Sequence, residues 1–548
     1  MPSVGYSRRA AWLLLALFTL VWFSTLEYRK LIKPDEGRYA EIAREMVQSG
    51  DWVTPRLNGL KYFEKPPLQY WATAASFRLF GLNEWTARFW VGLTGFAGVL
   101  LAVFAGRRLF GATAGMLAGV VLASNLWFVI IGHINTLDMG DTVFLELALF
   151  GFLLAQTSAR DSPAERRWML VAWAAMALAM LSKGLTGLVL PGMTLVGYCA
   201  LQRDMTPLKR MHFGAGLAVF FAIAAPWFVV VSIANPEFPR FFFIHEHFER
   251  FLTKAHGRYQ PAWYFVPIFA VGMLPWTFMT VHAAVAAWRK GGAVAFDARR
   301  FLVLWAGLIF LFFSASSSKL PSYILPIFPA LALLTGDWLA ARPARALRWH
   351  IAVLALVALA AVVFLPRIAQ ITDGETPDAM TLRYARWLLF AGALFTFATA
   401  LALWQSIRGA SLAALTTLGA AGLLTAEITL QGHEALGRSN SAYYIAKQIA
   451  PKLKAGVPFY SVGMYEQTLP FYVRRTLTLV DYKDEFAFGI EQEPKLAVPT
   501  VAEFKARWAS EPGALAVFTH EGYEQMTKEG LPMEPVAEDT RRVVVMRP

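Results

Sequence analysis

Long runs of apolar residues recur along almost the whole chain. A membrane-spanning helix needs about 20 consecutive apolar residues. Runs of this kind occupy 10–26, 88–106, 111–132, 142–157, 168–182, 184–201, 213–233, 262–287, 301–315, 320–341, 349–366, 386–405 and 409–430. The pattern predicts an α-helical polytopic membrane protein with about thirteen transmembrane helices, although 168–201 can also be read as one helix.

Polar segments interrupt this pattern at three places. Within 27–87, residues 35–49 and 67–82 have helical periodicity, and the second stretch is expected to lie at the membrane interface. A second polar segment covers 234–261, and the third covers 431–548. In this tail, helix-like 441–453 and a helical stretch near 464–472 alternate with strand-like 457–462, 476–481, 514–519 and 543–546. We therefore predict a membrane domain, 1–430, followed by a small α/β domain, 431–548.

Composition supports a membrane protein and excludes an ordinary soluble enzyme. Hydrophobic residues make up 56% of the 548 residues and charged residues only 16%, and the mean hydropathy is +0.44. The net charge of +13 is distributed among short loops, which indicates membrane topology and contact with anionic lipids, not nucleic-acid binding. The single cysteine, Cys199, lies in an apolar run, so no disulfide framework is expected.

The basic residues predict the orientation of the chain. Alternate connections carry clusters such as Arg107-Arg108, Arg166-Arg167 and Arg299-Arg300. By the positive-inside rule these connections are cytoplasmic. The loops 27–87 and 234–261 and the tail after residue 430 are then outside, and the first apolar run is a retained signal anchor.

Carboxylates from separate stretches fall on this outer face. Asp35, Glu36 and Arg38 share one helical turn, and Glu64-Lys65 and Asp138 lie in other outer connections. Acids at a helix N-terminus can simply be solvated and favoured by the helix dipole. Their convergence on one membrane face nevertheless indicates a site, because ionisable groups beside a bilayer are costly unless paired or functional.

Two lysines stand at outer helix ends, Lys183 and Lys319. Either they extend to lipid headgroups, or they bind a lipid-linked phosphate, where an ammonium stabilises the charge of a leaving group. Tyr62 and Tyr323 could add hydrogen bonds. The stretch His245-Glu246-His247 could hold a metal with a distant carboxylate, or could be a polar interfacial loop.

Several motifs together resemble a known family. They are Asp35-Glu-Gly-Arg-Tyr-Ala, Gly50-Asp-Trp-Val-Thr-Pro-Arg-Leu-Asn-Gly, Tyr62-Phe-Glu-Lys-Pro-Pro-Leu, Ser182-Lys-Gly and Lys319-Leu-Pro-Ser-Tyr-Ile-Leu-Pro. The chain is similar to bacterial GT-C glycosyltransferases related to protein O-mannosyltransferases, and among them to the 4-amino-4-deoxy-L-arabinose transferases that modify lipid A.

The resemblance implies a multi-pass enzyme of the bacterial inner membrane whose active site faces the periplasm. Its donor would be an undecaprenyl-phosphate-linked sugar and its acceptor the phosphate groups of lipid A, and we expect a monomer. Asp35, Asp138 and Glu64 match the catalytic positions. A divalent ion such as zinc is implied at Glu64 with His245. The residues expected to bind the donor phosphate and the substrate are Arg38, Tyr39, Tyr62, Lys65, Lys183, Lys319 and Tyr323.

Two alternatives stay open. A related polyprenyl-phosphate sugar transferase could act on a protein or another glycan, since these share the same motifs. A lipid or solute transporter is the alternative from another class. Transporters favour internal repeats and helix-breaking residues near the bilayer midplane, whereas this chain shows no repeat and places its acids in outer loops.

Overall fold

The computed structural model describes residues 7–249, 259–289, 296–368 and 376–548. Contacts divide the chain into two compact units. Unit 1 contains 1–26, 89–365 and 388–430, and unit 2 contains 27–88, 366–387 and 431–548. The outer loop 27–88 thus belongs to the same unit as the tail.

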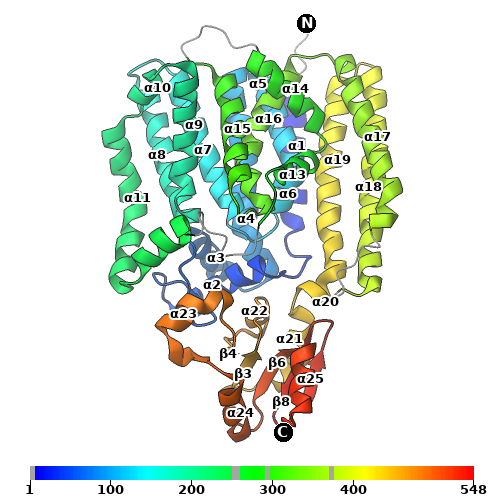
Figure 1. Cartoon of the computed structure of the whole chain (residues 1–548). Coiled ribbons are helices and arrows are strands. Elements are labelled where there is room, and N and C mark those ends of the chain that lie inside the picture. The colour runs from blue at the N-terminus through cyan, green and yellow to red at the C-terminus, as the bar shows by residue number, and fades with distance from the viewer. Residues whose placement is uncertain (1–6, 250–258, 290–295, 369–375) are drawn as a thin grey trace. The chain divides into compact units, whose positions relative to one another are not determined.

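Unit 1 is a bundle of long helices (Figure 1). Four of its helices, α4, α17, α18 and α19, extend into unit 2 at the boundaries. The helices are α1 (Arg8–Ser24), α4 (Glu84–Phe110), α5 (Ala112–Ser124), α6 (Leu126–Ile131), α7 (Asp138–Thr157), α8 (Pro163–Lys183), α9 (Thr186–Gln202), α10 (Thr206–Lys209), α11 (Phe213–Ala234), η1 (Arg240–Glu249), α13 (Phe265–Gly272), α14 (Thr277–Arg289), α15 (Ala298–Ala315), η2 (Pro321–Ile327), α16 (Phe328–Ala340), α17 (Ala344–Ile368), α18 (Asp378–Ile407) and α19 (Ser411–Gly432).

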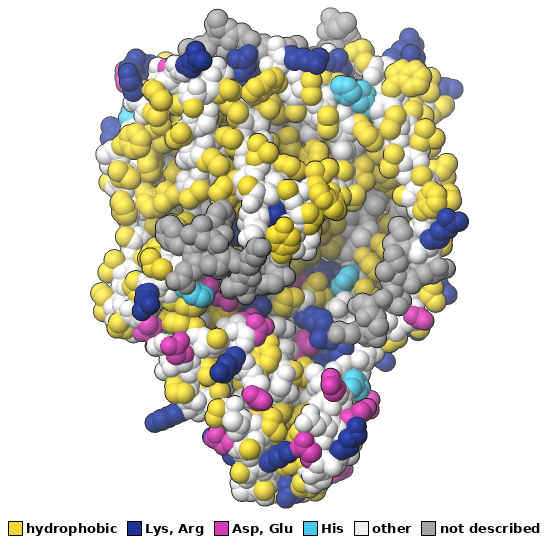
Figure 2. Space-filling view, viewed as in Figure 1, with side chains coloured by type: hydrophobic (Ala, Val, Ile, Leu, Met, Phe, Trp, Pro, Cys, Tyr) yellow, Lys and Arg dark blue, Asp and Glu magenta, His cyan; other side chains and the backbone are white. Residues whose placement is uncertain are grey.

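The helices coincide with the apolar runs of the sequence, but the number of crossings is not confirmed. Among the described residues, seven helices are long and apolar enough to span a membrane, or eight if the bent pair α13 and α14 forms one span. The region 168–201 is two helices, because the chain turns at Gly184, whose φ of 92° favours glycine. On the face of the bundle that is in view, most of the surface is hydrophobic, and Lys and Arg gather at the end where α10 lies (Figure 2).

Buried tryptophans hold the core of unit 1 together. Trp22, Trp276 and Trp305 are fully buried. Their ring N–H groups donate to Gly92 O at 2.8 Å, Ser124 Oγ at 2.9 Å and Pro326 O at 2.9 Å. A buried indole that lacks such an acceptor would be destabilising, so these bonds fix how neighbouring helices pack.

Unit 2 combines the outer loop with the tail. The loop forms α2 (Asp35–Ser49), the hairpin of β1 (Arg56–Leu57) and β2 (Leu60–Lys61), and α3 (Leu68–Phe80). Both helices match the predicted stretches. Helix α2 ends at Gly50, whose φ of 74° is the left-handed conformation of a C-terminal cap.

The tail is an α/β domain, as predicted. Its strands are β3 (Phe459–Val462), β4 (Thr478–Val480), β5 (Ala497–Val498), β6 (Leu515–Thr519), β7 (Glu534–Glu538) and β8 (Arg542–Met546). They form one sheet in the order β5-β4-β3-β6-β8-β7, in which the first four are parallel and β8 is antiparallel to both neighbours. Its helices are η3 (His433–Leu436), α20 (Gly437–Asn440), α21 (Tyr443–Ile449), η4 (Ala450–Lys452), α22 (Leu469–Val473), η5 (Asp484–Phe486), α23 (Ala487–Gln492), η6 (Pro494–Leu496), α24 (Val501–Ser510) and α25 (His520–Lys528).

Candidate active site

The first turn of α2 presents a carboxylate paired with a cation. Asp35 and Arg38 lie three residues apart, so both side chains are on one face of the helix. Arg38 Nη1 is 3.0 Å from Asp35 Oδ1, and the Asp35 side chain is 37% exposed. Asp35 is therefore held in place by Arg38 and remains open to solvent or a ligand.

The neighbouring carboxylate, Glu36, has different surroundings. It is fully buried and forms a two-point ion pair with Arg88, at 2.7 Å and 2.8 Å. Its second oxygen also accepts from the backbone N–H of Ile32 at 3.1 Å. The sequence pairs the two acids, but the structure separates them into a partly exposed group and a structural anchor.

Arg38 has a second acidic partner, Glu485, which belongs to the tail. Arg38 Nη2 forms an ion pair with Glu485 Oε2, and both side chains are largely buried. Burial raises the pKa of the Glu485 carboxyl, and the Arg38 guanidinium opposes that shift. Sequence reasoning missed Glu485, because no local spacing connects a residue of the tail to the start of α2.

Two tyrosines extend this cluster within unit 2. Tyr39 and Tyr62 are buried, and the ring of Tyr39 lies 6.0 Å from that of Tyr70. Burial raises the pKa of both phenols well above the ordinary value, with nearby carboxylates adding to the shift. Both are therefore neutral hydrogen-bond donors. Within the described part of the chain, the Tyr62 hydroxyl makes no hydrogen bond, so it can donate to a ligand.

Glu64 and Lys65 follow in the same segment. Both are partly buried, and the Lys65 ammonium donates to the Glu64 carbonyl oxygen at 2.8 Å. The preceding Phe63 is buried and packs on Phe488 at 5.7 Å, which fixes the segment from one side. Unit 2 thus brings together six of the predicted residues: Asp35, Arg38, Tyr39, Tyr62, Glu64 and Lys65.

Unit 1 holds a second charged cluster. Lys183 at the end of α8 lies beside Asp138 at the start of α7, with Nζ and Oδ1 2.6 Å apart. The ring of Tyr323 lies 4.9 Å from the same ammonium. Nearby, Thr186 donates to Asp141 Oδ1 at 3.3 Å. Three predicted residues therefore meet, and Asp141 is an acid that sequence reasoning did not single out.

Lys319 is engaged differently. Its buried ammonium donates to the carbonyl oxygens of Gln260, at 2.8 Å, and of Ser316. An ammonium has three N–H donors, and two of those of Lys319 bind backbone carbonyl oxygens here. Lys319 therefore has a structural role, because these two hydrogen bonds join the end of the loop 234–261 to the segment before η2.

The described residues around His245 do not form a complete set of metal ligands. His245 is half exposed, stacks on Phe241 at 5.1 Å and lies 3.7 Å from Glu246 Oε1. The side chain of His247 lies outside the described residues. Among those that are described, no three His, Cys, Asp or Glu side chains gather as a metal site requires. We therefore derive no chemical step through a metal, and zinc at Glu64 and His245 stays a prediction.

Comparison with family models gives two matches. Residues 445–547 match the aminoarabinose transferase C-terminal domain. Residues 64–229 match the dolichyl-phosphate-mannose-protein mannosyltransferase family. The first match covers most of the tail, and the second includes Glu64, Lys65, Asp138 and Lys183.

Relatives from several bacteria extend the similarity. An undecaprenyl phosphate-α-4-amino-4-deoxy-L-arabinose arabinosyl transferase of Aeromonas salmonicida is 36% identical over 327 residues, which are 59% of this chain and 58% of that protein. The match therefore spans less than two thirds of that relative. The transferase of the same name from Pectobacterium carotovorum is 31% identical over 408 residues, 71% of each chain.

Solved structures agree over nearly the full length. The crystal structure of ArnT from Cupriavidus metallidurans bound to undecaprenyl phosphate superposes with a TM-score of 0.93, at 39% identity over 99% of both chains. An Archaeoglobus fulgidus oligosaccharyltransferase shares the fold alone, with a TM-score of 0.51 and 12% identity over 94% of this chain and 69% of that one. This chain thus belongs to the family of aminoarabinose transferases with the GT-C fold.

Proposed function

We propose that this chain transfers 4-amino-4-deoxy-L-arabinose from undecaprenyl phosphate to phosphate groups of lipid A, on the periplasmic face of the inner membrane. The observation that carries the proposal is the likeness over 99% of the chain to the transferase crystallised with undecaprenyl phosphate. The two clusters of cations and carboxylates fit a reaction in which both donor and acceptor are phosphates.

In this reaction an oxygen of the acceptor phosphate attacks the anomeric carbon of the sugar. The bond from that carbon to the donor phosphate breaks, and undecaprenyl phosphate leaves with the electron pair. A phosphate acceptor is ionised at neutral pH and needs no strong general base. Inversion at the anomeric carbon is what the superfamily implies.

The main electrostatic requirement is then to stabilise the negative charge of the phosphates, which is a role for the cations. Lys65, Arg38, Lys183 and the third donor of Lys319 would hold the two phosphates and stabilise the charge that develops on the leaving one. Tyr39, Tyr62 and Tyr323 would donate hydrogen bonds to phosphate or sugar. Asp35, Asp138 and Glu64 would orient the acceptor, the neighbouring cations or the ammonium of the sugar.

The proposal is tested on the lipid itself. Lipid A from cells with and without the gene is compared by mass spectrometry, and the gene should add the mass of aminoarabinose. Unchanged lipid A, together with a sugar found on a protein or another glycan, would favour the related transferase. Movement of the donor lipid across vesicles without transfer would favour a transporter.

The metal requirement has a separate test. Purified enzyme is treated with a chelator and assayed, and zinc is then restored. If Glu64 and His245 bind a required ion, activity falls with the chelator and returns with zinc, and His245→Ala abolishes the response. Activity that is unchanged by the chelator would remove the ion from the mechanism.

A further inference from the structure

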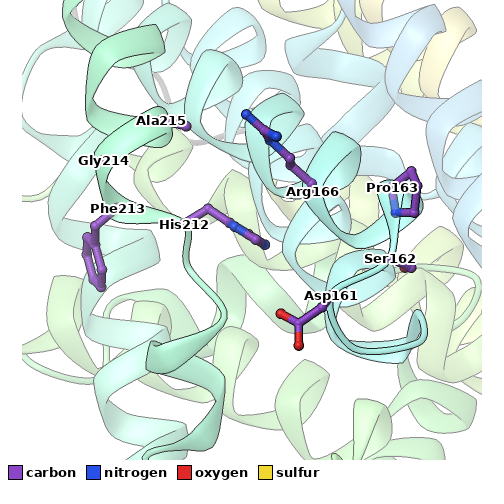
Figure 3. A pocket seen from close by; sticks show the side chains of 8 residues that line it. All are labelled: Asp161, Ser162, Pro163, Arg166, His212, Phe213, Gly214 and Ala215. Carbon is purple, nitrogen blue, oxygen red and sulfur yellow. The ribbon is translucent and has the colours of Figure 1, made fainter.

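A hollow lies at the opposite end of α8 from Lys183, between the starts of α8 and α11 (Figure 3). Its volume is about 610 Å³. Helix α8 has 21 residues, so at a rise of 1.5 Å per residue this end lies roughly 30 Å from Lys183. The lining residues are Asp161, Ser162, Pro163, Arg166, His212, Phe213, Gly214 and Ala215. By the alternation of basic loops, this end faces the cytoplasm.

The polar lining can bind a phosphate. Arg166 presents a guanidinium, whose fork of N–H donors matches phosphate oxygens, and His212 adds an imidazole from the segment before α11. Gly214 leaves open space on its side of the hollow, since a Cβ there would meet no atom within 4 Å. Phosphate oxygens can therefore approach the backbone of α11 closely.

The acids near the hollow do not cancel this charge. Glu165 is buried and already paired with a cation, because Arg210 Nη2 lies 3.0 Å from one of its oxygens. His212 Nε2 lies 3.4 Å from the other oxygen. Asp161 is exposed and lies 3.7 Å from Arg160. Figure 3 shows its side chain and that of His212 pointing toward each other, so Asp161 should weaken the binding of an anion without preventing it.

An apolar stripe continues from the hollow along α11. Phe213 lines the hollow, and Leu217 and Phe221 follow at intervals of four residues, so all three lie on one face. All three are exposed. Helix α11 is one of the helices that can span a membrane, and little of its surface is buried. The stripe therefore faces lipid, which distinguishes a lipid headgroup from free phosphate.

We propose that the hollow binds the phosphate headgroup of an anionic glycerophospholipid of the cytoplasmic leaflet, with an acyl chain against Phe213, Leu217 and Phe221. The site is separate from the two charged clusters described above. It would fix α11, a peripheral helix, to α8 through a lipid.

Native mass spectrometry of the full chain in detergent tests this proposal, with phosphatidylglycerol as the probe and phosphatidylcholine for comparison. Arg166→Gln should weaken phosphatidylglycerol binding about fivefold, the effect expected of one basic residue near a headgroup. The matched control is Arg167→Gln, since Arg167 is exposed, lies over the ring of Trp168 and does not line the hollow. Asp161→Asn should strengthen binding about twofold, because it removes a screened repulsion.

The result expected is a loss in Arg166→Gln that Arg167→Gln does not share, with partial recovery in Arg166→Lys. An equal loss in both glutamine variants would mean a diffuse basic surface and overturn the site. If inorganic phosphate displaces phosphatidylglycerol already at a concentration equal to that of the lipid, the acyl chain adds nothing to binding and the choice of a lipid is overturned. If Arg166→Gln cannot be recovered as a folded protein, the proposal is judged on Asp161→Asn. Phosphatidylglycerol binding that is unchanged in Asp161→Asn contradicts the proposal.

Discussion

Neighbouring residues at the start of α2 show how burial separates chemically identical groups. Asp35 is partly exposed and bound at one point by Arg38, whereas Glu36 is fully buried and bound at two points by Arg88. A buried carboxylate keeps its charge only when partners replace its water. Glu36 should therefore serve stability, whereas Asp35 keeps part of its side chain exposed.

Asp35→Asn is expected to lower transfer without affecting folding. The change keeps the size of the side chain and removes one charge, and loss of one preorganised electrostatic contact slows a reaction by about 10²–10³-fold. The rate is measured with purified enzyme and a polyprenyl-phosphate sugar donor. Asp378→Asn, which changes an exposed carboxylate at the start of α18, is the control and should keep full activity. If a well-folded Asp35→Asn protein transfers the sugar at the normal rate, Asp35 has no part in the reaction and is only a solvated acid at the N-terminus of α2.

Glu36→Gln should have the opposite signature. It leaves the Arg88 guanidinium buried without its counter-charge, and breaking a buried ion pair typically destabilises by about 3–5 kcal/mol. We expect a lower thermal unfolding midpoint and poorer recovery of the protein, while the enzyme that remains folded keeps its rate per molecule. A midpoint equal to that of the Asp35→Asn protein would contradict the assignment of Glu36 as an anchor.

At the scale of elements, the periodicity of the sequence predicts where helices and strands lie but not which of them are in contact. The bounds of α2 follow from its apolar face and from Gly50, and β3, β4, β6 and β8 match the predicted strands. Strand β7 was missed because its Glu534, Pro535 and Glu538 give no alternating pattern, and β5 because it has two residues. The pairing of Arg38 with Glu485 depends on tertiary packing, which no local pattern encodes.

Gly37→Ala should reveal how tightly α2 packs within unit 2. Alanine normally stabilises a helix interior by about 1 kcal/mol relative to glycine. At Gly37, however, the added Cβ would lie 2.6 Å from Thr468 Cγ2 and 2.7 Å from the backbone of Gln467. We therefore expect a lower thermal midpoint, because overpacking costs about 1–3 kcal/mol. Gly307→Ala in α15, where a Cβ meets no atom within 4 Å, is the control and should not destabilise. A stabilised Gly37→Ala protein would contradict this packing.

At the scale of the whole molecule, hydropathy predicts helices better than it predicts crossings. Every predicted apolar run contains a helix. Among the described residues, however, only seven or eight helices are long and apolar enough to span a membrane. Breaks explain part of the difference. Helices α13 and α14 meet at 107°, and α5 gives way to α6 at Asn125. A sliding window averages over such breaks, so it cannot report whether a bent pair crosses the bilayer once.

The orientation of the chain is testable at the point where the tail begins. If the clusters of basic residues mark cytoplasmic connections, the tail and the loop 27–87 face the periplasm, where lipid A phosphates can meet Asp35 and Lys65. Alkaline phosphatase fused after residue 432 should then be active, because that enzyme folds only outside the cytoplasm. The same enzyme fused after Arg342, in a connection rich in arginine, should be inactive, and a cytoplasmic reporter should give the inverse pattern at both junctions. Activity of the cytoplasmic reporter after residue 432 would place the candidate active site on the wrong side of the membrane for the proposed acceptor, whatever the resemblance to its relatives.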